Sequence, residues 1–146
     1  MTIWKTTPDI DTFNTMAPNS ILDVIGIRFT EFGDDWLRGT MPVDHRTHQP
    51  YGLLHGGASV VLAETLASVA ATCCVEPGEE MAVGLDINAN HIRAVTTGVV
   101  TGTAKAVHIG RSTQVWEIRI VDDRERLVCI SRITLAVVAP RPLKNA

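Results

Sequence analysis

Apolar and polar residues follow two different periods along the chain, and together these predict one long helix and about six strands. Residues 26–32 and 36–43 are rich in β-forming side chains and are joined by the turn sequence Gly33-Asp34-Asp35, which predicts a hairpin. Residues 58–75 are apolar on nearly every side, which predicts a helix wrapped by other elements. The chain therefore begins with a hairpin and continues into a long buried helix.

Further strand-like segments follow a turn at Pro77-Gly78. They comprise residues 81–91, 99–108, 112–122 and 127–138, which we expect to form an antiparallel meander of four strands. Each should bury one face, and the alternation that predicts this is clearest in Val83, Leu85, Ile87 and Ala89 and in Trp116, Ile118 and Ile120. We therefore expect an α+β fold in which an antiparallel sheet of about six strands wraps the helix.

The N-terminal segment has the signals of a short helix. Thr7 supplies a capping hydroxyl, Pro8 suits the first helical position, and Pro18 ends a helix that should reach about Ala17. No composition shift, linker or repeat interrupts residues 1–146, so we expect a single domain. With 45% hydrophobic and 20% charged residues, the chain should be folded throughout.

The charge and the cysteine content limit which partners and which cellular compartment we expect for this protein. The formal charge is −3 and the basic residues form no run, which argues against a nucleic-acid partner. Three cysteines, two of them adjacent, suit neither a disulfide framework nor a metal site, and the N-terminus lacks a secretory signal. The longest apolar stretch carries Glu64 and several hydroxyls, so we expect no membrane span and a cytoplasmic location.

Glu64 is the most informative residue, because it is an isolated acid in the middle of the apolar helix. A buried, unpaired carboxylate is costly, and catalysis is a common reason to keep one. The alternative is structural: Glu64 marks a hydrated face with Thr65, Ser68 and Thr72, or pairs with a distant base such as Arg132. Ser68 lies one turn beyond Glu64 on the same face, where its hydroxyl could orient the carboxylate.

A second chemical feature is the sequence His55-Gly56-Gly57 at the start of the same helix. Free backbone N–H groups and the positive end of the helix dipole favour developing negative charge there, and glycine permits a substrate carbonyl to approach closely. The plain alternative is an ordinary loop-to-helix junction. His45 and His48 beside Asp44 have no convincing third ligand, so we expect neither a metal nor another cofactor.

The spacing of these two features predicts the assembly. Gly56 and Glu64 are eight residues apart on one helix, which separates them by about 12 Å at a rise of about 1.5 Å per residue. One chain cannot place both groups on one carbonyl. If both act in one reaction, two antiparallel copies of the helix must meet across a two-fold axis, and a homodimer is the smallest active species.

Three segments carry a family resemblance. Gln49-Pro-Tyr-Gly-Leu-Leu-His-Gly-Gly-Ala-Ser-Val-Val-Leu-Ala-Glu64 resembles the signature of hotdog-fold acyl-CoA thioesterases of the phenylacetate-degradation type. The resemblance continues through Val83-Gly-Leu-Asp-Ile-Asn-Ala-Asn-His91 and His108-Ile-Gly-Arg-Ser-Thr-Gln-Val-Trp116. Within that family the chain resembles the 1,4-dihydroxy-2-naphthoyl-CoA thioesterases of menaquinone synthesis and the proofreading thioesterases of enterobactin synthesis.

The resemblance implies roles for individual residues. Glu64 would attack the thioester carbonyl or activate water, while Gln49 positions the nucleophile or the substrate. His55 would lie beside the thioester, the Gly56 amide would polarise its carbonyl, and Ser68 would stand near the carboxylate. The residues that match CoA-contacting regions of relatives are His91, Arg93, Arg111 and Ser112.

Hydrolysis of an acyl-CoA or carrier-bound thioester without a cofactor is the function that these residues favour. The resemblance implies an aromatic acyl group, such as 1,4-dihydroxy-2-naphthoyl or hydroxybenzoyl, and a tetramer built as a dimer of dimers. The alternative is a non-catalytic hotdog module that binds acyl-CoA. Gln49, His55 and Glu64 argue against that alternative, because binding alone requires no isolated carboxylate.

Overall fold

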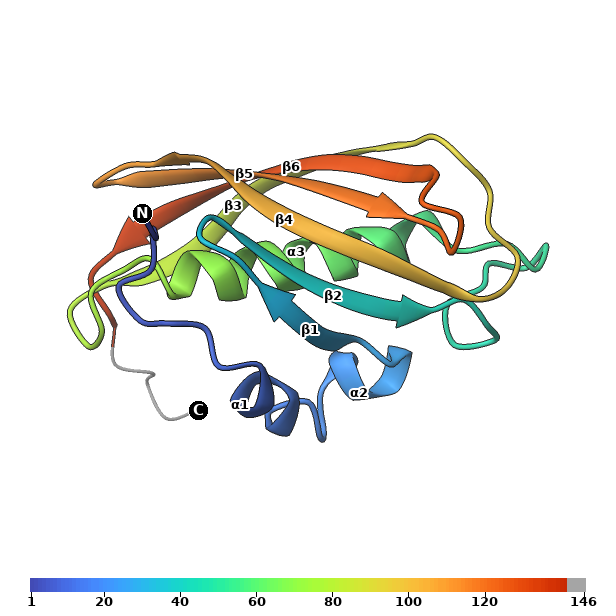
Figure 1. The fold of residues 1–146 in the computed structure, drawn as a ribbon, viewed down its shortest axis with the longest axis horizontal. Helices are drawn as coiled ribbons and strands as arrows, with labels where there is room; N and C mark the ends of the chain where they lie inside the picture. The colour runs from blue at the N-terminus through green and yellow to red at the C-terminus, as the bar shows by residue number, and fades with distance from the viewer. Residues whose placement is uncertain (142–146) are drawn as a thin grey trace.

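A computed structural model describes residues 1–141 as two short helices, one long helix and a six-stranded sheet (Figure 1). In chain order the elements are α1 (Ile10–Thr15), α2 (Ile21–Ile25), β1 (Arg28–Phe32), β2 (Trp36–Pro42), α3 (Gly56–Thr72), β3 (Met81–His91), β4 (Val99–Ile109), β5 (Thr113–Val121) and β6 (Leu127–Val138). Every neighbouring pair of strands is antiparallel, and α3 lies along one face of the sheet (Figure 1). The predicted α+β class, with a long helix against an antiparallel sheet, is confirmed.

The predicted meander of four strands is wrong in one respect. The strand order is β1-β2-β4-β5-β6-β3, so β3 pairs with β6 at the edge of the sheet instead of lying beside β4. The connection between β3 and β4, residues 92–98, crosses the end of the sheet where α3 begins (Figure 1). Strand character alone does not specify the neighbours of a strand, because the partner is chosen by tertiary packing.

A bulge in β3 also changes which of its side chains are buried. The register with β6 shifts between Gly84 and Asp86, so the strand changes phase there. Val83 and Leu85, expected on the buried face, are 40% and 63% exposed, whereas Ile87 packs partly against the core. The alternation predicted for β5 is confirmed, since its apolar side chains Trp116, Ile118 and Ile120 are fully buried.

The N-terminal segment differs from the expected single helix. Asp9, not Thr7, caps α1, because its carboxylate accepts the N–H of Thr12 at 3.1 Å. The helix ends at Thr15, and a second short helix, α2, follows and was not predicted. It ends at Ile25 and is capped by Gly26, whose φ of 75° is the left-handed conformation that glycine adopts without strain.

One face of α3 forms the centre of the core. Its buried positions are Ser59, Leu62, Ala63, Leu66, Ala67, Ala70 and Ala71. In the last turn of the helix, the Ala71 carbonyl accepts a hydrogen bond at 3.3 Å from the buried Gln114 side chain, whose Oε1 accepts from Trp116 Nε1 at 2.9 Å. The opposite face, including Val60, Val61 and Glu64, is not buried in the single chain, so the expected burial on all sides is not found within one copy.

Two glycines on paired strands allow α3 to approach the sheet closely. Gly39 of β2 and Gly102 of β4 are cross-strand partners, and the Leu66 side chain lies against both. A Cβ atom on either glycine would come within 2.8 Å of a Leu66 methyl carbon. The absence of side chains at this pair therefore sets the distance between the helix and the sheet.

None of the helices in residues 1–141 is long and apolar enough to cross a membrane.

Replacing Gly102 with alanine should destabilise the fold, because the new methyl group overlaps the Leu66 side chain under a packed helix. We expect the free energy of unfolding to fall by about 1–3 kcal/mol, which urea denaturation would measure. Thr101→Ala, on the neighbouring, partly exposed position of β4, is the matched control and should change stability by less than about 0.5 kcal/mol. An equal stability for Gly102→Ala and the control would contradict the close contact.

Candidate active site

The first turn of α3 presents a free backbone donor. His55 caps the helix, with its Nδ1 atom accepting the Gly57 N–H at 2.8 Å. Because Nδ1 accepts, the neutral ring carries its proton on Nε2 and can donate from that atom. The N–H of Gly56 donates to no acceptor within residues 1–141, so it is available to a ligand at the positive end of the helix dipole.

A cavity of about 360 Å³ opens beside this turn. Its lining includes four residues expected in the site: Gln49, Gly56, His91 and Arg93. The His91 ring lies directly on Gly56, since a Cβ atom there would be 2.8 Å from His91 Nε2. Leu53, Leu54 and Ile92 add apolar surface. The cavity therefore combines an available amide with an apolar wall, which suits a substrate carrying both a carbonyl and an apolar group.

The loop before α3 fixes the orientation of Gln49. The backbone N–H of Gln49 donates to the Leu53 carbonyl at 2.8 Å, and its carbonyl accepts from Gly52 at 3.0 Å. The side-chain Oε1 accepts the N–H of Tyr51. Because a backbone N–H can only donate, this contact identifies Oε1 as the acceptor and leaves the amide NH₂ group free to donate into the cavity.

Glu64 occupies the middle of α3 but is exposed in the single chain, which corrects the expectation of a buried carboxylate. Its Oε1 atom lies against Gly84 of β3, 3.0 Å from the place where a Cβ would be. No salt bridge among residues 1–141 involves Glu64, and Arg132 instead lines a hollow with Asn88 and Glu117. The alternative of a Glu64–Arg132 pair is therefore not found.

The remaining predicted residues lie elsewhere. Ser68 is one turn beyond Glu64, and no hydrogen bond joins the two side chains in the described part of the chain. Arg111 lines a hollow with Cys74 and Val75, just past the C-terminal end of α3. Nearby, the backbone carbonyl of Ser112 accepts the Val137 N–H at 2.9 Å. Within one chain, the predicted site residues therefore lie at three separate places: near the start of α3, in its middle and near its C-terminal end.

Gly84 is the residue of this region that sequence reasoning missed. A glycine inside a strand pattern indicates a bulge or a close approach of another group, and both occur here. The signal was present in the sequence Val83-Gly-Leu-Asp86, but the partner of the glycine comes from a helix some twenty residues earlier. Only the fold identifies that partner as Glu64.

Neither a metal nor a cysteine nucleophile is suggested by the described side chains. Residues 1–141 contain no group of three His, Cys, Asp or Glu side chains placed to hold a metal ion, and His48 Nε2 lies 2.8 Å from the Thr96 carbonyl. Burial raises the pKa of the Cys73 thiol to about 11, and burial with the neighbouring Cys73 raises that of Cys74 to about 12. These two thiols stay protonated at neutral pH and are poor nucleophiles.

Comparison with known proteins places this geometry in a family. Residues 51–129 match the family model described as the thioesterase superfamily. The chain is similar to a protein named 1,4-dihydroxy-2-naphthoyl-CoA hydrolase from Escherichia coli, with 51% identity over 93% of this chain and 98% of the relative. It is also similar to a protein named proofreading thioesterase EntH from Cronobacter turicensis, with 46% identity over 93% of this chain and 98% of the relative.

A solved structure agrees with these relatives. The crystal structure of a mutant (Q49A) of thioesterase PA1618 from Pseudomonas aeruginosa superimposes with a TM-score of 0.93. It shares 51% sequence identity and covers 95% of this chain and 100% of its own. The chain belongs to the thioesterase superfamily, and it is a thioesterase of the hotdog fold.

Proposed function

We propose that this thioesterase hydrolyses an aromatic acyl-CoA, such as 1,4-dihydroxy-2-naphthoyl-CoA or a hydroxybenzoyl thioester, to the free acid and CoA. The observation that carries the proposal is the available Gly56 N–H at the start of α3, in a cavity lined by Gln49 and His91. A relative named for hydrolysis of 1,4-dihydroxy-2-naphthoyl-CoA supports the choice of acyl group. The same relative supports a place in menaquinone synthesis.

The proposed chemistry begins with polarisation of the thioester carbonyl. The Gly56 N–H at the positive end of α3 stabilises the negative charge that develops on the carbonyl oxygen. Gln49, with its amide NH₂ group free, and His55, through Nε2–H, are further donors at this end of the helix. Glu64 supplies the nucleophile directly or removes a proton from water. The carbon–sulfur bond then breaks, and the departing thiolate takes up a proton. If Glu64 is the nucleophile, water next hydrolyses the resulting acyl–Glu64 anhydride, which releases the free acid and restores the carboxylate.

Two subunits are required to build this site, because α3 carries Gly56 and Glu64 eight residues apart, about 12 Å along one helix. A homodimer with antiparallel α3 helices brings Glu64 of one copy to Gly56 of the other. It also brings the end of one copy that holds Arg111 and Ser112 next to the cavity of its partner. These residues, with His91 and Arg93, are our proposed CoA contacts.

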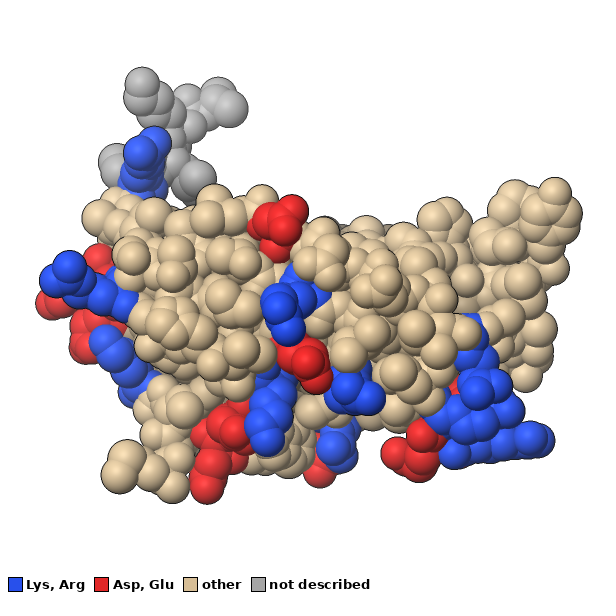
Figure 2. Space-filling model, turned by 90° about the horizontal axis from the view of Figure 1, so that it is seen from above, with Lys and Arg blue, Asp and Glu red and all other residues tan. Residues whose placement is uncertain are grey.

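The surface of the single chain supports this assembly. β3 is an edge strand with one side of its backbone unpaired, and Met81, Val83 and Leu85 are exposed along it. Its 11 residues include one acid, Asp86, and no Lys or Arg. Charged side chains gather along one long side of the molecule, while the opposite side is nearly free of them (Figure 2). An uncharged edge of this kind is suited to pairing with a second copy.

We also propose that two such dimers form a tetramer and that the protein works in the cytoplasm. The three cysteines are free and buried, which suits a reducing compartment.

Replacing Glu64 with glutamine or alanine should remove most of the turnover and preserve the fold, because an exposed side chain contributes little to stability. We expect kcat for a panel of aryl-CoA thioesters to fall at least about 100-fold, measured by release of free thiol. Thr72→Ala, an exposed position on the same helix, is the control and should retain its activity. Near-native turnover in Glu64→Ala would show that Glu64 is not the central residue of the mechanism.

Replacing Gly84 with alanine should impair catalysis through Glu64. The added methyl group would lie 3.0 Å from Oε1 and displace the carboxylate by a few tenths of an ångström. We expect kcat to fall about tenfold while KM changes less than about twofold, since positioning errors at the reacting atoms are costly. Asn88→Ala, elsewhere on β3, is the control. If Gly84→Ala kept its full kcat, contact with Gly84 would not position Glu64.

Mixed dimers test the shared site directly. A Glu64→Ala subunit keeps Gln49, His55 and Gly56, whereas a Gln49→Ala/His55→Ala subunit keeps Glu64. Co-refolding the two inactive variants should give hybrid dimers with one complete site, restoring up to about half of the wild-type activity per hybrid. Each variant refolded alone is the control. Hybrids shown to form by mass spectrometry but lacking activity would place the site within one chain.

A further inference from the structure

Ser59 is a buried polar residue of α3 that the proposed mechanism leaves unused. The residue is 1% exposed and lies on the face of the helix that packs against the sheet. It also lines the cavity of about 360 Å³ that contains Gly56. Buried hydroxyl groups are nearly always hydrogen-bonded, because leaving one unpaired costs about 1–3 kcal/mol. The partner of the Ser59 hydroxyl is therefore informative about the site.

This hydroxyl has no hydrogen-bond partner within residues 1–141. A helical serine commonly bonds the carbonyl four residues earlier, but the His55 carbonyl accepts only backbone N–H groups, from Ala58 at 3.0 Å and Ser59 at 3.3 Å. In this part of the chain, the Ser131 hydroxyl of β6 is the one side-chain polar group that is fully enclosed without a hydrogen bond. The unpaired Ser59 hydroxyl is therefore not fully enclosed, and it opens on the cavity that the residue lines.

The first turn of α3 offers a substrate a single backbone donor. The Gly57 N–H is taken by His55 Nδ1 at 2.8 Å, and the next two N–H groups bond to the His55 carbonyl. Among residues 56–59, only the Gly56 N–H remains available. Oxyanion sites in acyl transfer hold the developing charge with preorganised donors, which include side chains as well as backbone amides. A second donor from this turn to the same oxygen therefore has to be a side chain.

Ser59 is placed to supply that second donor. It follows Gly56 by three residues, so the two lie on the same side of the helix, at positions about 5–6 Å apart. Helical side chains lean toward the N-terminus, which brings the Ser59 hydroxyl over the turn that begins with Gly56. One oxygen can accept from two donors that are up to about 6 Å apart, since each hydrogen bond spans about 2.7–3.0 Å. The two groups can therefore bind one carbonyl oxygen together.

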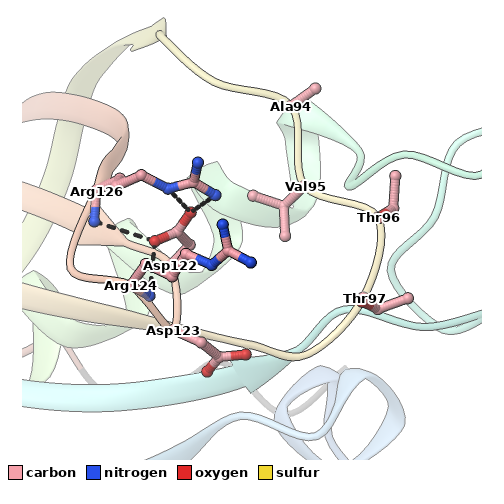
Figure 3. A pocket seen from close by; sticks show the side chains of 8 residues that line it. All are labelled: Ala94, Val95, Thr96, Thr97, Asp122, Asp123, Arg124 and Arg126. Carbon is pink, nitrogen blue, oxygen red and sulfur yellow. Dashed lines mark hydrogen bonds and ion pairs between the residues drawn. The ribbon is translucent and has the colours of Figure 1, made fainter.

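The charge around this cavity also favours an anionic oxygen. Its lining contains Arg93 and no acidic side chain. The adjoining cavity, of about 340 Å³, has a mixed lining, in which two arginines stand beside the acids Asp122 and Asp123 (Figure 3). Asp122 accepts from Arg126 Nε there at 2.9 Å, so part of the positive charge is already neutralised. Negative charge that develops on a substrate is therefore better accommodated beside Gly56.

We propose that Ser59 is a catalytic residue whose hydroxyl, together with the Gly56 N–H, stabilises the oxyanion formed from the thioester carbonyl. When the nucleophile attacks the carbonyl carbon, the π electron pair moves onto the oxygen, which accepts both hydrogen bonds. The Ser59 proton stays on its own oxygen, and the electron pair returns to the carbonyl as the carbon–sulfur bond breaks. The inference rests on the proposed placement of the carbonyl at Gly56. It applies to any acyl group, because the contact is to the thioester itself.

The test compares Ser59→Ala and Ser59→Cys with wild type on benzoyl-CoA, 2-hydroxybenzoyl-CoA and hexanoyl-CoA. Both variants should lower kcat about 100-fold for every thioester that wild type hydrolyses and change KM less than about twofold, because a donor to the transition state is lost. Cysteine keeps a side chain of similar shape, but its S–H is a weak donor. Ser131→Ala removes the fully enclosed serine hydroxyl of β6, and this matched control should keep its full kcat.

Four other outcomes are distinguishable. Full kcat in Ser59→Cys, with a loss in Ser59→Ala, would assign Ser59 to packing and overturn the proposal. A loss confined to 2-hydroxybenzoyl-CoA would move the contact from the carbonyl to the acyl ring, and a change in KM alone would make it a ground-state contact; both overturn the proposal. If wild type hydrolysed hexanoyl-CoA and neither aryl thioester, the aromatic substrate of the proposed function would fail, and the kcat values on hexanoyl-CoA would decide the role of Ser59.

A measurement without turnover decides the same point. Phenacyl-CoA, in which a methylene group separates the carbonyl from the sulfur, cannot be hydrolysed as a thioester. Hydrogen bonds to its carbonyl lower the stretching frequency, which infrared difference spectroscopy with an isotope-labelled carbonyl measures. The downward shift should be smaller in Ser59→Ala than in wild type and Ser131→Ala. Equal shifts in the three proteins would show that Ser59 does not contact the carbonyl, whatever the substrate.

Discussion

The close contact between α3 and the sheet is the constraint on which the rest of the structure depends. Leu66 fits against Gly39 and Gly102, and the buried alanines of the helix keep its backbone near the strands. This packing fixes the direction of α3 and therefore the positions of its first turn and its middle. The available Gly56 N–H and the Glu64 carboxylate are therefore both held by a rigid helix. A rigid element suits groups that must be positioned precisely relative to a substrate.

The start and the middle of that helix have different chemistry. At the first turn, backbone contacts turn Gln49 and His55 into donors, because Tyr51 and Gly57 occupy the acceptor atoms of their side chains. Negative charge is therefore favoured there. Glu64 is separated from these donors by two turns and lies on Gly84 at a bulge of β3. A site that needs both donors and carboxylate is incomplete within one copy of this chain, which is why the proposed function and the proposed assembly are one hypothesis.

The surfaces that are exposed in the single chain also favour contact with a second copy. The face of α3 that bears Glu64 and the free edge of β3 adjoin each other, and neither is covered in the single chain. Isolated exposed apolar residues need no explanation. A strand with one unpaired edge and with Met81, Val83 and Leu85 exposed along it, however, is a surface that folded proteins usually cover.

The sequence by itself determined the type of nearly every element and the local chemistry of α3. Periodicity located the strands to within one or two residues, since the burial of one strand face leaves a direct record in the order of residues. The isolated Glu64 and the glycines after His55 were also visible in the sequence, because an acid within an apolar helix and paired glycines at its start stand out by residue type alone. Spacing on a helix also gave their separation, because the rise per residue is constant.

Only the tertiary structure decided which segments meet. The place of β3 beside β6, the bulge that exposes Leu85, and the contact between Gly84 and Glu64 all join residues distant in sequence. The same is true of His91 on Gly56. Local patterns record whether a residue is buried but not against what, because packing energy depends on the partner and the partner is set by the whole fold.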